Sequence, residues 1–256
     1  MSATKFSYTA LAAAAFLAAC SSTSGPSTAG RSVAFQLATK PAGAAIRGAA
    51  LAGQETIAVG NDTIVVTGVQ LVLRKIELER SVPSAACDSL APTSDDCEEL
   101  KAGPVLLDLP LGAGAQRSFN VAIDTGSYGK IKFEIHRPTS SDDAAFLAAN
   151  PGFDGVSVKM TGTYNGVAFT YMSDLDVEQE HTFVPPITVT DAAGANLTLF
   201  VDLNSWFLNQ GATGLIDPAT ANKGGQAEGE VKSNIEASLN AFEDDNHDGH
   251  DDHSSS

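Results

Sequence analysis

The sequence predicts a mainly β protein, a β-sandwich of about 8–10 mostly antiparallel strands with a C-terminal amphipathic helix. Three observations predict it: apolar and polar residues alternate from Val33 onward, turn residues recur along the chain, and helical spacing is confined to short stretches. A chain of 256 residues with 43% apolar side chains buries one substantial core, so we expect one main domain at residues 31–210.

A change of phase marks the longest expected strand. Residues 69–73 place alternate apolar side chains on one face, whereas Ile76 and Leu78 continue on the opposite parity. The switch at Arg74-Lys75 predicts a β-bulge, or a strand that is buried on both faces over part of its length. Further strands are expected at residues 105–109, 119–123 and 131–135.

A hairpin is expected at residues 156–171, where two alternating stretches flank Asn165-Gly166. This dipeptide readily adopts the positive φ angles that a two-residue type I′ turn requires. A turn at this position places Met160 opposite Tyr171, so the large apolar side chains of both strands share one face.

The next expected strands lie near residues 187–190 and 197–201 and flank a turn at residues 191–194. Pro185-Pro186 cannot lie inside a central strand, because proline has no N–H to donate, so this pair indicates an edge strand or a sheet crossing. Trp206-Phe207 is expected to anchor a turn into the core; a ligand-stacking platform is the alternative.

Helix is expected in few places. Short helical turns are predicted near residues 142–149 and 205–209. Residues 211–242 are expected to form a connecting segment and the C-terminal helix, which covers one end or face of the sandwich. The helical spacing is carried by Val231, Ile235, Leu239 and Phe242.

Residues 1–19 have the composition of a secretory signal peptide, with a basic start and an apolar stretch before small residues. The motif Leu17-Ala18-Ala19-Cys20 resembles the lipobox of bacterial lipoproteins. The resemblance implies that the Cys20 sulfur carries diacylglycerol, that the residues before it are removed and that the new amino group is acylated. Ser21 in place of aspartate implies the outer membrane of the bacterial envelope. Residues 20–30 then form the lipidated end and a flexible Ser-rich tether.

The other two cysteines, Cys87 and Cys97, bracket nine residues. With Cys20 assigned to lipid, and the compartment oxidising, they are expected to form a disulfide. Redox catalysis is the alternative. The spacing is not that of a CxxC motif, and the acidic residues around it would raise a thiol pKa.

The C-terminal segment, residues 243–256, is rich in Asp and His. Part of it matches the DxNxDG pattern of a calcium loop, in which alternate oxygens converge on a hard cation and glycine permits a sharp bend. The expected calcium ligands are Asp244, Asn246, Asp248 and Asp252, with Gly249 at the bend. The usual bidentate glutamate is missing, because its position is Ser255. A solvated acidic tail is the alternative.

The same segment allows a different metal. His247, His250 and His253 recur every three residues between carboxylates, and imidazole with carboxylate suits zinc, nickel or copper. Of the remaining histidines, His136 is expected on the polar face of its strand and His181, which follows Glu178-Gln179-Glu180, is expected to be exposed on the surface. No catalytic motif is present in the sequence. An enzyme would need a deep pocket that gathers one of these two histidines with carboxylates.

The formal charge of −16 excludes nucleic acid as a partner, because no basic run opposes it. Removal of residues 1–19 leaves 14 basic against 31 acidic residues, a charge of −17, and residues 243–253 hold six of these acids. About a third of the excess negative charge therefore lies in one short segment.

Three stretches, at residues 69–79, 105–109 and 126–131, resemble a group of bacterial lipoproteins with a transthyretin-like or carboxypeptidase-regulatory-like sandwich of unknown function. The resemblance spans residues 33–205 and implies a fold but no activity. The sequence thus predicts a lipid-anchored, non-catalytic envelope module that requires no cofactor and has a candidate calcium site. Its expected partners are the membrane, through Cys20, and an envelope protein or glycan. A transition-metal-handling lipoprotein is the alternative function.

Overall fold

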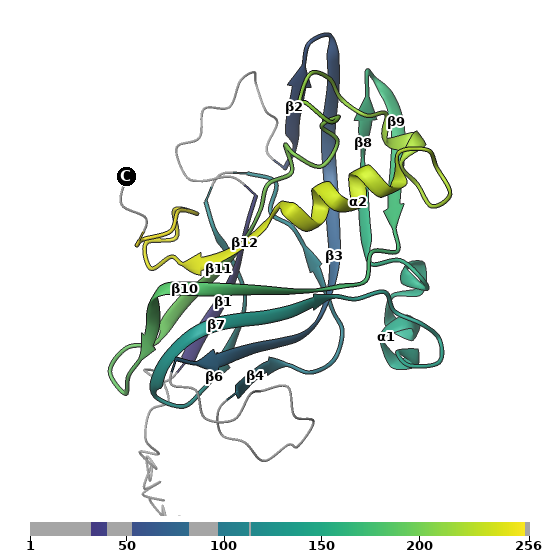
Figure 1. Cartoon of the computed structure of the whole chain (residues 1–256). Helices are drawn as coiled ribbons and strands as arrows, with labels where there is room; N and C mark the ends of the chain where they lie inside the picture. Colours follow the sequence, from purple (N-terminus) through teal and green to yellow (C-terminus); the bar gives the residue numbers. More distant parts are fainter. Residues whose placement is uncertain (1–31, 40–52, 82–96, 113, 254–256) are drawn as a thin grey trace, which may run out of the picture.

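The computed structural model describes residues 32–39, 53–81, 97–112 and 114–253, and these form two sheets in a sandwich-like arrangement (Figure 1). The smaller sheet has the order β12 (Leu239–Glu243), β11 (Ala195–Val201), β1 (Ser32–Ala38) and β6 (Gln116–Ala122). The larger has the order β10 (Val177–Val189), β7 (Gly126–Ile135), β3 (Asp62–Arg80), β8 (Val158–Tyr164) and β9 (Val167–Ser173). Three further strands pair with β3: β2 (Glu55–Val59), β4 (Cys97–Lys101) and β5 (Val105–Asp108).

The mainly β sandwich is therefore confirmed. All pairs between named strands are antiparallel except that of β1 with β11. The described residues also contain the helices α1 (Ala144–Ala149) and α2 (Glu228–Ala237) and the 3-10 turns η2 (Pro151–Phe153) and η3 (Pro218–Thr220). None of the helices in the described part of the chain has the length and apolar character needed to cross a membrane.

The central strand β3 is irregular where the sequence changes phase. Its pairing with β7 shifts register between Arg74 and Glu77, and Lys75 has a φ of 51°. The apolar residues on both sides of this point are buried, and Val72 is buried on the opposite face. The predicted β-bulge is confirmed. The extra residue lets apolar side chains of opposite parity enter the core.

The predicted hairpin is confirmed with its register. Met160 lies opposite Tyr171, and Asn165 and Gly166 have φ angles of 49° and 82°. The proline prediction is confirmed as well, because β10 is the edge strand of the larger sheet and its pairing with β7 is interrupted between Thr182 and Ile187.

The C-terminal helix is shorter than predicted. It ends at Ala237, and Leu239 and Phe242, which were expected on its apolar face, lie in β12. The spacing of these residues fits a helix, but pairing with β11 satisfies the backbone of both strands and buries Leu239 in the core. Trp206 and Phe207 are fully buried, so the prediction that they anchor a turn is confirmed.

A partly buried carboxylate joins the larger sheet to α2. Asp174, which follows β9, accepts hydrogen bonds from the ammonium groups of Lys232 at 2.5 Å and Lys223 at 2.9 Å. These hydrogen bonds, that of Lys232 first, lower the pKa of Asp174 to about 2. The charged carboxylate is therefore stabilised in the folded protein relative to the unfolded chain.

Replacing Asp174 by Asn is expected to lower the free energy of unfolding at pH 7 by roughly 1 kcal/mol, since solvent screens the partly exposed ammonium groups. A depressed carboxyl pKa stabilises the fold above the unfolded-state value near 3.9 and loses that effect as the pH falls toward 2. Urea unfolding of both proteins should show a difference at pH 7 that shrinks below pH 4. A pH-independent difference would contradict the assignment.

Candidate functional site

The C-terminal loop, which we define as residues 243–253, is folded against the smaller sheet. Asp244 directly follows β12 and is 0% exposed. Its carboxylate accepts hydrogen bonds from the hydroxyl of Thr198 on β11 at 3.1 Å and from the backbone N–H groups of Asp248 at 3.0 Å and Gly249 at 2.9 Å. The alternative of a solvated tail is therefore wrong for Asp244, whereas Asp245, Asn246 and Asp252 are exposed.

The turns of the loop follow the predicted pattern. The side-chain oxygen of Asn246 accepts from the N–H of Asp248 at 2.8 Å, and that of Asp248 accepts from the N–H of His250 at 2.8 Å. His247 and Gly249 have positive φ angles of 62° and 77°. The backbone therefore turns sharply around the side chains of alternate residues, as the DxNxDG pattern requires.

Asp252 closes the loop. Its carboxylate accepts from the backbone N–H of Asp245 at 2.6 Å and from the side-chain amide of Asn246 at 3.0 Å, and its own N–H donates to the carbonyl of Glu243 at 3.2 Å. Asp252 thus lies beside the expected ligand positions although Ser255 replaces the usual glutamate.

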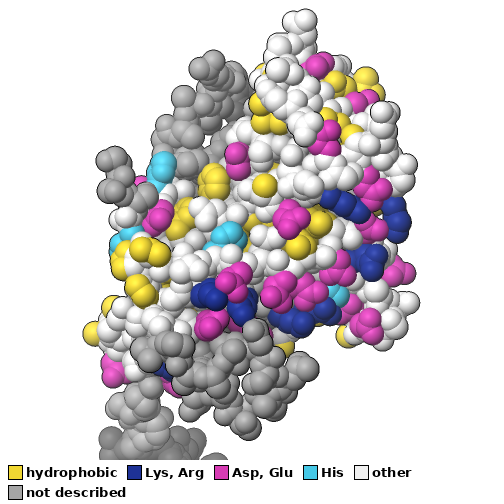
Figure 2. All heavy atoms as spheres, in the orientation of Figure 1, with side chains coloured by type: hydrophobic (Ala, Val, Ile, Leu, Met, Phe, Trp, Pro, Cys, Tyr) yellow, Lys and Arg dark blue, Asp and Glu magenta, His cyan; other side chains and the backbone are white. Residues whose placement is uncertain are grey.

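The loop carries uncompensated negative charge. Among the described residues, no Lys or Arg forms an ion pair with Asp244, Asp245, Asp248 or Asp252. His253 contacts Glu243 at 2.7 Å, and this hydrogen bond raises the pKa of His253. On another part of the surface, Figure 2 shows basic and acidic side chains interleaved in a band, and Lys130 of β7 contacts Glu180 of β10 at 2.8 Å.

The three histidines of the loop do not converge. His247 and His250 are exposed, and His253 turns to Glu243. Among the described residues, ligand atoms of three His, Cys, Asp or Glu side chains come within 4.8 Å of one another at Glu134, His136 and Asp176 alone. The loop carboxylates are therefore also more widely spaced than in a closed metal site.

His136 was expected on a solvated face, and that expectation is wrong. It is 4% exposed, and its Nε2 lies 2.7 Å from a carboxylate oxygen of Asp143, just before α1. The chain after β7 folds back to bring Asp143 onto the imidazole, which strand periodicity does not reveal. Burial would raise the pKa of Asp143, but hydrogen bonds from His136 and from the N–H of Thr139 lower it.

His181 is also not freely solvated. It is half-buried and its ring stacks on Phe133 with the centroids 5.7 Å apart. Burial lowers the pKa of His181. No ion pair of His181 with a carboxylate is present in the described part of the structure.

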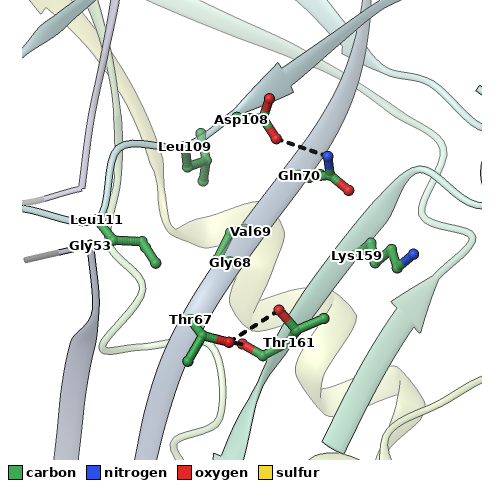
Figure 3. A pocket seen from close by; sticks show the side chains of 10 residues that line it. All are labelled: Gly53, Thr67, Gly68, Val69, Gln70, Asp108, Leu109, Leu111, Lys159 and Thr161. Atoms are coloured by element: carbon green, nitrogen blue, oxygen red, sulfur yellow. Dashed lines mark hydrogen bonds between the residues drawn. The ribbon is translucent and has the colours of Figure 1, made fainter.

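A pocket of about 360 Å³ lies beside β3, β5 and β8 (Figure 3). Four of its polar side chains form two pairs: the Gln70 amide donates to Asp108 at 2.8 Å, and the hydroxyl of Thr67 contacts that of Thr161 at 3.3 Å. Neither His136 nor His181 lines it. A second pocket, of about 440 Å³, adjoins Asp143.

Two groups of sequence predictions lie wholly or partly outside the described residues. The signal peptide, the lipobox with Cys20 and the tether precede residue 32. Cys87 lies in the segment 82–96, and Cys97 begins β4 with no described side chain, so the predicted disulfide stays a prediction.

Comparison of the chain with models of protein families, with curated proteins and with solved structures gave no match in any of the three.

Proposed function

We propose that the protein is a lipid-anchored, non-catalytic binding module of the bacterial cell envelope, and that its C-terminal loop binds calcium. The observation that carries the calcium assignment is Asp244, a fully buried carboxylate at the first position of a DxNxDG pattern. A buried anion with no cationic partner among the described residues is costly, and a bound cation removes that cost.

Calcium would be held by side-chain oxygen atoms of the C-terminal loop. The proposed ligands are the side-chain oxygens of Asp244, Asn246 and Asp248, with Asp252 in place of the missing glutamate. Because these carboxylates lie farther apart than the ligands of a closed site, binding requires side-chain rotation within the loop. Mixed carboxylate and amide oxygens suit a hard cation.

The position of the loop supports a structural role for the ion. Asp244 accepts from Thr198 on β11, so a cation held here would fix the loop that follows β12 against the neighbouring strand of the smaller sheet. The anchor rests on the resemblance of residues 17–20 to a lipobox. The module would then display this sheet to an envelope protein or a glycan, without catalysing a reaction.

Isothermal titration of the full chain in detergent with Ca²⁺ tests the proposal. Asp248→Asn keeps an oxygen for the N–H of His250 but loses a charged ligand, so its Kd should rise about tenfold or more. Asp154→Asn, an exposed carboxylate remote in sequence, is the matched control and should leave the Kd unchanged. Absence of binding, or equal Kd values for the wild type and Asp248→Asn, would reject the calcium site.

A further inference from the structure

We infer that Glu134, His136 and Asp176 form a second metal site, for a divalent transition metal such as zinc, and that Asp143 is its positioning residue. This site is separate from the C-terminal loop and does not rest on the proposed function. Glu134 lies at the end of β7, His136 directly follows this strand, and Asp176 directly precedes β10.

His136 has a ring nitrogen without a hydrogen-bond partner. His136 is 4% exposed, and its Nδ1 is buried without a hydrogen-bond partner. A buried ring nitrogen that loses its hydrogen bonds to water and forms none within the protein destabilises the folded state. The atoms that lie nearest to Nδ1 therefore indicate which kind of ligand would satisfy this nitrogen.

Two carboxylates lie on that side. The Nδ1 atom is 3.5 Å from Oε1 of Glu134 and 4.0 Å from Oδ1 of Asp176, and the three ligand atoms lie within 4.8 Å of one another. The register explains the arrangement. Glu134 and His136 are two residues apart on one face, and pairing of Ile135 with Val177 places Asp176 across from His136.

Asp143 fixes which nitrogen is available. A carboxylate can only accept a hydrogen bond, so Nε2 of His136 donates to it across 2.7 Å. In the neutral imidazole the lone pair is then on Nδ1, the atom that faces the two carboxylates. A carboxylate on the far nitrogen of a metal-binding histidine is the usual means of orienting the ring.

A protonated imidazole explains the geometry less well. Its Nδ1–H would have Glu134 as the nearest acceptor, and 3.5 Å is too long for a good hydrogen bond. Glu134 is already bound by Arg74, whose Nε and terminal nitrogen donate at 3.1 and 2.7 Å. Arg137 lies 4.0 Å from Asp176. These cations hold the carboxylates in place but leave Nδ1 without a partner.

The ligand types indicate the metal. One imidazole and two carboxylates suit zinc or another first-row transition metal better than calcium, which takes oxygen ligands alone. Three protein ligands leave a further coordination position for water. Asp176 has a side chain that is 39% exposed, so the metal can enter from solvent on that side.

The test is zinc titration of the full chain in which His247, His250 and His253 are replaced by Ala, so that the C-terminal loop contributes no imidazole. We expect one zinc ion per chain. Asp176→Asn should weaken binding at least tenfold, because it removes one ligand at a partly exposed position that the fold tolerates. Asp124→Asn is the matched control: it removes an exposed carboxylate just before the start of β7, at the opposite end of that strand from Glu134, and should change the Kd less than twofold.

Substitution with Co²⁺ supplies a second readout, because its visible absorption reports coordination by the imidazole. The spectrum should change in Asp176→Asn and in Asp143→Asn, for which a 10- to 100-fold weaker Kd is expected. Absence of one-to-one binding, or equal weakening by Asp124→Asn and Asp176→Asn, would overturn the site. Because Asp248→Asn should bind zinc normally, failure here is distinguishable from failure of the calcium proposal.

Discussion

Replacing Trp206 by Ala is expected to lower the free energy of unfolding by about 3–5 kcal/mol. Trp206 is the only tryptophan of the chain and is fully buried. Its indole N–H donates to the hydroxyl of Ser238 at 2.8 Å, and the side-chain amide of Asn234 donates to its carbonyl at 3.0 Å. The substitution leaves a large cavity. It also leaves the hydroxyl of Ser238, at the C-terminal end of α2, without its hydrogen-bond donor.

Urea unfolding followed by far-UV circular dichroism measures this effect without the tryptophan signal. Trp206→Phe is the matched control, because it keeps most of the buried ring and loses the donor to Ser238. It should cost only about 1–2 kcal/mol. If both variants lost the same stability, the hydrogen bond rather than the packing would dominate, and the cavity argument would be wrong.

The position of Trp206 makes this residue important for the C-terminal loop as well. It follows β11, and Ser238 directly precedes β12, so the hydrogen bond joins the two chain segments that pair in the smaller sheet. The loop that holds Asp244 begins where β12 ends. Packing in the core thus positions the proposed calcium ligands through the strand that leads to them.

The features that the sequence predicted correctly depend on neighbours in the chain. Asn165-Gly166 determines the turn and the register of the hairpin because both strands adjoin it. The irregularity near Arg74 is visible because the parity of buried residues changes within one strand. The DxNxDG pattern likewise predicts the turns at Asn246 and Asp248, whose partners are two residues away.

The features that it missed depend on distant partners. The segment after Ala237 is a strand because β11, about 40 residues earlier, offers an edge for pairing. His136 is buried beside Asp143 and faces Asp176, which lies just before β10. The periodicity of apolar residues within one segment gives no information about such contacts. The one available signal was the placement of Glu134 and His136 on the same strand face.

Replacing Cys20 by Ala is expected to abolish fatty-acid labelling of the protein completely. If residues 17–20 act as a lipobox, the sulfur of Cys20 forms the thioether to diacylglycerol, and alanine has no atom to replace it. Each buried methylene contributes about 0.8 kcal/mol to membrane binding, so a protein without acyl chains should leave the membrane fraction.

Labelling of expressing cells with a radioactive fatty acid, followed by separation of membrane and soluble fractions, measures both effects. Cys87→Ala is the matched control, because it removes a thiol of the same chain while leaving the motif intact. It should retain the label and the membrane location. Equal labelling of Cys20→Ala and the wild type would refute the anchor. The proposed calcium and zinc sites would still stand, because both are argued from the folded residues alone, but they would belong to a protein without a lipid anchor.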